Sequence, residues 1–299
     1  MTNPNPSTPT SAAISSDQSH VIEEALNQIL HIATLPEITM KIIEVVENPE
    51  STAQDLNKII SNDPALCARV LKVVNSAFYG LPGQIGSINR AIVLLGLNAV
   101  KNIAIAASLS KLFKGGQISP DFNAMELWRH STAVAAGSKL IADKMKLNLP
   151  DEAFLAGLIH DIGMVVEIQA LRPKLLELLD YKNAKGTTLI KSEQAILGVT
   201  HQELGKALCE RWKFPHSFAC VTGYHHNPLE LDPSRRTLTC VVHLADVLAA
   251  QGGFGYTGTV CSTEINPEIL TVLNLTEAQV QEILESLPEA VELADQFLR

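Results

Sequence analysis

The sequence predicts an all-α protein, and three observations support that fold class. Apolar residues recur at helical spacing in two early stretches, which are Ile22, Ala25, Leu26 and Ile29 and then Leu66, Val70, Leu71 and Val74. Helix start signals precede several apolar runs. No alternating pattern of the kind that predicts a β-strand persists along the chain.

The start and stop signals define the helices in chain order. Helices are expected after Ser51-Thr52, after Asp63-Pro64 and from Pro150 onward, because a polar cap or a proline precedes each apolar run. Glycine and proline interrupt the helical pattern at residues 80–83 (GLPG) and 115–120 (GGQISP). A glycine-rich loop is expected at residues 251–256, followed by short helices to Arg299.

The interruption at residues 115–120 is the best boundary between two lobes. Residues 1–19 are rich in Ser, Thr, Pro and Asn and predict a disordered tail. We therefore expect an N-terminal helical lobe over residues 20–116 and a second lobe, with C-terminal helices, over residues 117–299. A single packed unit would fit the same pattern.

Composition limits the classes of protein. An apolar content of 46% is sufficient for a large buried core. The net charge of −9 argues against a nucleic-acid surface, since neutralising phosphates needs clustered Lys and Arg. The apolar runs at residues 91–97 and 153–159 are shorter than the roughly 18 residues of a membrane span, so no membrane segment is expected. The five cysteines form no CxxC pair, which favours reduced thiols. Residues 1–19 lack the features of a secretory signal, so we expect a cytoplasmic protein.

Potential metal ligands recur between residues 126 and 246 of a chain that has only nine histidines. They are Glu126, His130, His160, Asp161, His201, His225, His226 and Asp246. Imidazole and carboxylate groups together suit Fe, Mn, Zn or Ni, and the His-Asp doublet would allow one carboxylate to bridge two ions. Glu126 and His130 are four residues apart in a predicted helix, which places them on one face. The set predicts a site for one or two metal ions.

Several of these residues also have an ordinary structural explanation. His160 could cap the apolar helix of residues 154–159, with Asp161 in a salt bridge. His201 could be only the first residue of a helix, and Asp246 could lie on a partly solvated face. One of His225 and His226 could support the other. We expect His243 to be a supporting or surface residue and not a ligand.

Several stretches, in order, give the chain a resemblance to a known family. They are residues 35–36 (LP), 63–66 (DPAL), 75–80 (NSAFYG), 85–96 (IGSINRAIVLLG), 127–131 (LWRHS), 154–163 (FLAGLIHDIG), 203–205 (ELG), 212–215 (WKFP) and 225–226 (HH). Over about residues 20–260 the chain resembles the HDOD domain, a signalling-associated relative of the HD superfamily of metal-dependent phosphohydrolases. The resemblance implies a two-lobed, all-helical protein with a metal pocket in its C-terminal lobe.

The resemblance also implies two alternative functions. Many HDOD proteins are regulatory modules without established catalysis. The ligand set of this chain, however, is similar to that of the HD-GYP phosphodiesterases, which hydrolyse cyclic di-GMP with iron or manganese. Two departures argue against that reaction: Met164 replaces the lysine that follows the His-Asp-Ile-Gly motif, and the Gly-Tyr-Pro signature is absent.

We therefore expect an HDOD-type signal-transduction protein with a mono- or dinuclear site, most favourably of Fe or Mn. The alternative is an active phosphohydrolase or phosphodiesterase acting on a nucleotide or cyclic dinucleotide, in which Asp161 bridges two ions and Glu126 is a further ligand or a proton acceptor. A partner protein is expected on the N-terminal lobe near residues 75–80, unless Phe78 and Tyr79 only close that lobe's core. A nucleotide is a further candidate ligand; nucleic acid and membrane are not expected partners.

Overall fold

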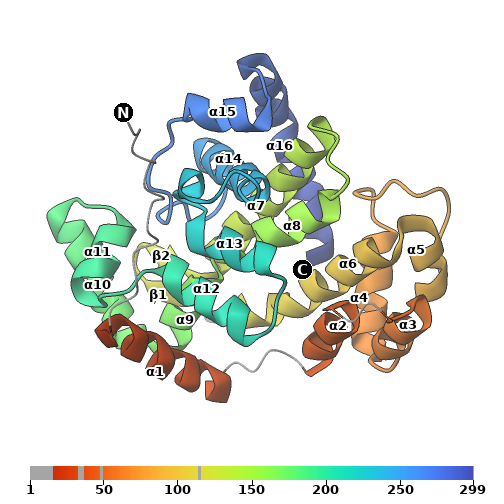
Figure 1. Cartoon of the computed structure of the whole chain (residues 1–299), viewed down its shortest axis with the longest axis horizontal. Helices are drawn as coiled ribbons and strands as arrows, with labels where there is room; N and C mark the ends of the chain where they lie inside the picture. The colour runs from red at the N-terminus through yellow and green to blue at the C-terminus, as the bar shows by residue number, and fades with distance from the viewer. Residues whose placement is uncertain (1–15, 33–36, 48–49, 114–115, 299) are drawn as a thin grey trace, which may run out of the picture.

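A computed structural model describes residues 16–32, 37–47, 50–113 and 116–298. Within this part of the chain nearly every element is a helix, so the predicted all-α fold class is confirmed (Figure 1). Residues 1–15 of the expected tail and the Leu35-Pro36 motif lie outside the described residues. A continuous cluster of buried apolar side chains extends from Ile22 to Ala294.

The first half of the chain forms a group of helices around α6. This group lies at the lower right of Figure 1. They are α2 (Glu37–Glu47), α3 (Ala53–Ser61), α4 (Pro64–Val74), α5 (Ile88–Leu95), α6 (Leu97–Leu109) and the 3-10 helix η1 (Ser110–Phe113). The predicted start signals are confirmed. Thr52 accepts a hydrogen bond from Asp55 N in a capping box, and Asp63 accepts one from Leu66 N.

The first helix, α1 (Ser16–Ile32), begins within the expected tail and packs against α9 and α12 of the second half. Ile22, Ala25 and Leu26 are buried there, so the predicted apolar stripe is real. Its partner is not the neighbouring group of helices. An apolar stripe shows that one face of a helix is buried, but it does not show which element covers that face. We therefore propose that the N-terminal lobe begins at α2 and not at residue 20.

The second half is built around the long helix α7 (Ala124–Lys144), which packs against α8, α14 and α16. The other elements of this half are α8 (Pro150–Ile159), α9 (Ile162–Ala170), α10 (Arg172–Lys185), α11 (Leu189–Ile196), α12 (His201–Arg211), α13 (His216–Tyr224), η2 (Pro228–Glu230), α14 (Thr237–Gln251), α15 (Pro267–Leu273) and α16 (Glu277–Leu298). A division near residue 116 between the two halves stays a proposal.

The predicted boundary turn contains a small element that the sequence analysis missed. Strands β1 (Gln117–Ser119) and β2 (Phe122–Asn123) form an antiparallel pair with Gln117 opposite Asn123. Strands this short lack the alternating run by which a sheet is recognised in a sequence. The pair leads directly into α7, whose first turn is capped by the Asn123 side chain.

Residues 150–170 have the length and mean hydropathy, 1.4, of a membrane-spanning helix, which we did not expect from shorter apolar runs. In the structure 89% of the most apolar 18-residue window of this segment is buried within the fold. It is divided into α8 and α9 by a break at His160-Asp161.

Phe78 and Tyr79, two of the residues proposed for partner binding, contact the second half of the chain. The Tyr79 hydroxyl donates to Asp151 Oδ1 at 3.0 Å, and the ring of Phe78 lies 5.3 Å from that of Phe154. Asn75 is bonded to the backbone of Ile85 in both directions, which fixes the loop after α4. Both aromatics are therefore engaged inside the molecule, but with the second half of the chain and not only with the core of the N-terminal lobe, as the structural alternative had it.

Candidate metal centre

The ends of helices position most of the predicted ligands. His160 and Asp161 occupy the break between α8 and α9, His201 is the first residue of α12, and His225 follows the last residue of α13. A helix end directs adjacent side chains differently from a helix interior, so both members of a doublet can face one space. The capping box of Thr200 and Glu203 fixes where α12 begins, and therefore where His201 lies.

A glycine allows the helices to approach each other at this point. A Cβ atom on Gly163 would lie 1.8 Å from the carbonyl oxygen of His201. Because Gly163 has no side chain, α9 packs directly on α12 and places Asp161 beside His201. This contact gives a physical reason for the glycine of the HDIG sequence in this chain.

Asp161 is the centre of one group of ligands. Its Oδ1 atom lies 3.4 Å from His201 Nε2 and 3.3 Å from His225 Nε2. His226 completes the group, with its Nε2 atom 3.1 Å from that of His201. The four residues each offer one ligand atom within 4.8 Å of the others.

The other carboxylate oxygen of Asp161 faces a second group. Asp161 Oδ2 lies 3.3 Å from His160 Nε2, and His130 joins these two residues within the same 4.8 Å limit. Asp246, on α14, contacts the group through Oδ1, which lies 2.9 Å from His130 Nε2 and 3.8 Å from His160 Nε2. The structure thus brings together seven predicted ligands, with Asp161 shared between two groups.

Four of the imidazoles are held by hydrogen bonds on the side away from the cluster. The Nδ1 atom of His130 faces the carbonyl oxygen of Phe254, that of His160 faces Gly157, and that of His225 faces Thr222, at 3.2, 2.7 and 3.1 Å. His201 Nδ1 faces the carboxylate of Glu193. Each ring therefore carries a proton on Nδ1, and in its neutral form it presents an unprotonated Nε2 to the cluster, as metal-binding histidines do.

Burial and charge oppose each other in the centre. Burial would lower the pKa of His160, but the nearby carboxylates of Asp161 and Asp246 raise it to about 9. Burial would raise the pKa of Asp161, yet the imidazoles of His160, His225 and His201 hold it well below its usual range. Burial lowers the pKa of His226 well below its usual value, and the charges of His225 and His201 add to that effect.

Two supporting carboxylates were missed by the sequence analysis. Glu193, on α11, lies 2.8 Å from His201 Nδ1 and also accepts the backbone N–H of His201. Glu167, on α9, is fully buried, and neither of its oxygens has a hydrogen-bond partner among the described residues. Burial, then the charge of Glu193, raises the pKa of Glu167 well above its usual value. The only sequence signal was an acidic residue inside an apolar run, VVEI, at residues 165–168.

Glu126, proposed as a ligand or proton acceptor, does not join either group. Its side chain is exposed, and its backbone carbonyl accepts a hydrogen bond from Tyr256 N. The four-residue spacing to His130 keeps the two side chains near one face of α7, but only His130 points toward α14. His243 also stays outside both groups, as predicted; its Nδ1 atom lies 2.7 Å from the carbonyl oxygen of His225.

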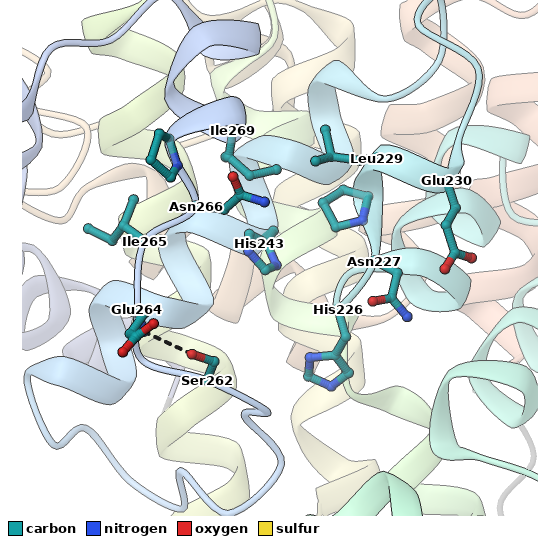
Figure 2. Close-up of a pocket in the computed structure, with 12 residues that line it drawn as sticks. His226, Asn227, Leu229, Glu230, His243, Ser262, Glu264, Ile265, Asn266 and Ile269 are labelled. Carbon is teal, nitrogen blue, oxygen red and sulfur yellow. Dashed lines mark hydrogen bonds between the residues drawn. The ribbon is translucent and has the colours of Figure 1, made fainter.

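A cavity of about 590 Å³ lies beside the centre, and His226 and His243 form part of its wall (Figure 2). One side consists of residues 226–230, and the other consists of residues 262–269 in the loop before α15 and its first turn. Its charged lining residues are Glu230 and Glu264, and it has no lysine or arginine. The five cysteines are free thiols, and none of them is in a ligand group; Cys261 is exposed.

The model of the HDOD domain matches residues 32–228. The chain belongs to the HDOD domain family. An uncharacterized protein of Treponema pallidum (strain Nichols) is 27% identical over 209 residues, which are 66% of this chain. The chain spans 38% of the length of that relative.

Solved structures share the HDOD fold of this chain. An HDOD domain protein of unknown function from Geobacter sulfurreducens is 24% identical, with a TM-score of 0.77 over 93% of this chain and 98% of that one. A Shewanella amazonensis SB2B protein, named provisionally as a phosphohydrolase, is 22% identical, with a TM-score of 0.71 over 92% and 98% of the chains. A Marinobacter aquaeolei VT8 protein, named provisionally as a signal transduction protein, is 22% identical, with a TM-score of 0.74 over 94% of this chain and 64% of that one. At these identities the likeness establishes the fold alone.

Proposed function

We propose that this HDOD protein is a regulatory protein of signal transduction that holds two metal ions in its C-terminal half. The observation that carries the proposal is the position of Asp161, whose two oxygens face two separate groups of histidines. One carboxylate between two groups of ligands is an arrangement that suits a dinuclear site, because it can bridge two ions. A site for a single ion would use only one of the groups.

The residues fit metal ions because the cluster is incomplete without a cation. Both oxygens of Asp161 and the Nε2 atom of His160 are buried without a hydrogen-bond partner. A buried ionised carboxylate is costly unless it is paired or bound to a metal. The Nε2 atoms of His201 and His225 lie 3.4 Å apart with both Nδ1 atoms bonded elsewhere, so two lone pairs would face each other when both rings are neutral. A cation between them would remove that repulsion.

The donor set favours iron or manganese, with zinc and nickel as weaker candidates. His130, His160 and Asp246 would hold one ion, and His201, His225 and His226 the other, with Asp161 shared between them. The groups contain no cysteine, and imidazole and carboxylate donors suit these divalent ions. The carbonyl and Glu193 contacts on Nδ1 would set the basicity of the imidazoles and hold their orientation.

Regulation is favoured over hydrolysis by what surrounds the centre. Met164, in place of a lysine, is fully buried and offers no charge to a phosphate. The adjacent cavity is lined by Glu230 and Glu264 and by no lysine or arginine, so an anionic substrate would meet repulsion there. These features do not suit a cyclic dinucleotide.

A phosphohydrolase is the second candidate, because His226 belongs both to a ligand group and to the wall of the cavity. A small molecule in the cavity would therefore reach the centre. When bound, two metal ions would supply a Lewis acid and an activated water for attack on a phosphoester. The side chains would hold and orient the centre, but Glu126 is too exposed to serve as its proton acceptor.

Metal analysis of protein purified without oxygen tests the proposal. We expect close to two equivalents of iron or manganese in the wild type and a large loss of metal in Asp161→Ala. The matched control is Asp143→Ala, because Asp143 is 54% exposed on α7. Wild-type protein without metal under metal-replete conditions would overturn the proposal. The loaded protein is then incubated with cyclic dinucleotides, nucleotides and phosphomonoesters. Turnover that Asp161→Ala abolishes would favour the phosphohydrolase.

We further propose that the N-terminal group of helices contacts a protein partner. Phe78 and Tyr79 are engaged inside the molecule, so the more suitable surface is α5, where Val93 is 75% exposed and Leu94 is 39% exposed. Cross-linking to a defined signalling partner should weaken in a Val93→Lys, Leu94→Lys variant. Unchanged cross-linking would remove α5 from consideration.

A further inference from the structure

The loop that follows α14, residues 252–256 (GGFGY), packs against helix α7 beside the metal centre. The carbonyl oxygen of Phe254 lies 3.2 Å from His130 Nδ1, and Tyr256 N donates a hydrogen bond to the carbonyl oxygen of Glu126 at 2.8 Å. Glu126 and His130 are about one helical turn apart. The loop therefore contacts α7 along the turn that ends at a predicted metal ligand.

Gly255 is the residue that permits this contact. Its φ of +67° lies in the left-handed region that favours glycine. A Cβ atom at this position would lie 2.3 Å from the carbonyl oxygen of Glu126 and 2.4 Å from the backbone nitrogen of His130. Any side chain at position 255 would therefore hold the loop away from α7.

The loop holds one side of the His130 ring, which is fully buried. Among the described residues this ring makes hydrogen bonds with two groups, Phe254 O at Nδ1 and Asp246 Oδ1 at Nε2. A metal ion binds an unprotonated Nε2, so the ring must carry its proton on Nδ1, where Phe254 O accepts it. A loop displaced from α7 would leave the ring without this partner, and the ring would no longer be held in one orientation and one tautomer.

The second group of ligands is held by other parts of the fold. His201 Nδ1 faces Glu193 on α11, and His225 Nδ1 faces the carbonyl oxygen of Thr222 on α13. Neither contact comes from the loop of residues 252–256. Displacement of the loop should therefore affect the ligand group of His130 before it affects the group of His201 and His225.

The far end of the loop is fixed by side chains outside α7. The ring of Tyr256 lies 4.3 Å from that of Phe122 on β2, and Lys182 Nζ on α10 lies 5.7 Å from the centre of the Tyr256 ring. Removing the Tyr256 side chain would loosen the loop without introducing a clash. This position gives a second way to disturb the same contact.

We propose that Gly255 is a positioning residue for the metal centre, because it lets the loop reach α7 and hold His130 for the ion shared with His160 and Asp246. The two metal positions would then depend on separate parts of the fold, one on this loop and the other on Glu193. The effect on metal occupancy rests on the proposed metal function, but the hold on the His130 ring does not.

Titration of metal-free protein with manganese(II), with the free ion measured by electron paramagnetic resonance, tests the effect on occupancy. We expect two equivalents in the wild type. Gly255→Ala should bind one equivalent with nearly unchanged affinity and the other about 10-fold or more weakly. The matched control is Gly253→Ala, because Gly253 has a φ of +68° but a Cβ atom there would have nothing within 4 Å. It carries the same backbone strain and should keep both equivalents.

A double-mutant comparison shows which position is weakened. His130→Gln should itself weaken one equivalent, and adding Gly255→Ala to it should change little, since both act on the same ligand. If Gly255→Ala does not fold, Tyr256→Ala takes its place and should weaken the same equivalent.

Nuclear magnetic resonance of metal-free protein with labelled histidine tests the hold on the ring directly. We expect a His130 Nδ1–H signal that exchanges slowly with water in the wild type and in Gly253→Ala, because the group is buried and bonded to Phe254 O. The signal is assigned by its absence in His130→Gln. It should be lost or exchange rapidly in Gly255→Ala and in Tyr256→Ala.

Two results would overturn the proposal. Wild-type manganese affinity and an unchanged His130 signal in Gly255→Ala would show that the loop does not position the ring. Equal weakening of both equivalents, in the presence or absence of His130, would show that Gly255 supports only the fold. If the wild type binds no manganese, the metal proposal fails, and the spectra of the metal-free protein still decide whether the loop holds His130.

Discussion

Glu193 holds His201 by two contacts: its Oε1 atom lies 2.8 Å from His201 Nδ1, and its Oε2 atom accepts the backbone N–H of His201 at 3.2 Å. The opposite nitrogen of the same ring lies 3.4 Å from Asp161 Oδ1. Glu193 therefore fixes both the position of the ring and the nitrogen that carries its proton. A carboxylate in this position also makes the imidazole a stronger ligand.

Replacing Glu193 with glutamine should lower metal affinity about 10–100-fold, because the ring loses a charged partner but keeps a hydrogen bond of similar length. Competition with a chelator of known affinity measures the change. Glu210→Gln, at an exposed position on the same helix as His201, is the control and should bind as the wild type does. Equal affinity in Glu193→Gln would mean that Glu193 supports only the fold.

Metal binding should release protons and strengthen as the pH rises. Without metal, His160 is protonated at neutral pH because its pKa is raised to about 9, whereas a metal ion binds only the neutral imidazole. Each proton displaced gives up to about a 10-fold gain in affinity per pH unit, and the gain ends near the pKa. Titrations in buffers of different ionisation enthalpy count the protons. Metal binding at pH 7 without proton release would contradict this assignment.

The buried Glu167 should make the metal-free protein less stable as the pH rises. Its folded pKa is well above the value of 4.5 expected in the unfolded chain, so between these values the folded state holds the extra proton. The contribution of Glu167 to stability is then greatest at low pH and falls by up to about 1.4 kcal/mol per pH unit as the pH rises through this range. Glu167→Gln, which does not titrate, should remove that fall.

Urea unfolding of the metal-free protein between about pH 5 and pH 8 measures the difference. Glu177→Gln is a matched control, because Glu177 is 58% exposed on α10. Its stability should follow the wild-type profile. If Glu167→Gln and the wild type lose stability in parallel, Glu167 is ionised in the folded protein.

Local signals predicted the helices and the ligands well. Thr52, Asp63 and Thr200 act within one turn of helix, so the residues that they cap are visible in the sequence itself. The histidine and aspartate ligands were found because buried polar groups are unexpected in apolar helices. Seven of them meet in the structure, and metal binding by them stays a prediction.

Contacts between elements could not be predicted in the same way. Glu193 reaches His201 from a different helix, and its own surroundings, Ser192 and Gln194, suggest an ordinary polar face. Glu126 has the correct spacing from His130, but spacing does not determine which of two neighbouring side chains faces α14. Helix α1 showed a clear apolar stripe whose partners, α9 and α12, lie far along the chain.

The close contact at Gly163 gives a test of how the fold builds the centre. A Cβ atom at this position would lie 1.8 Å from the carbonyl oxygen of His201, so Gly163→Ala would force α9 away from α12. Such overpacking typically costs about 1–3 kcal/mol, and here it would also separate Asp161 from His201 and so lower metal content. Gly86→Ala is the control, since a Cβ atom there would have nothing within 4 Å. Denaturant unfolding and metal analysis of both variants measure the effects; a Gly163→Ala protein with wild-type stability and metal content would show that the two helices can move apart without cost to the centre.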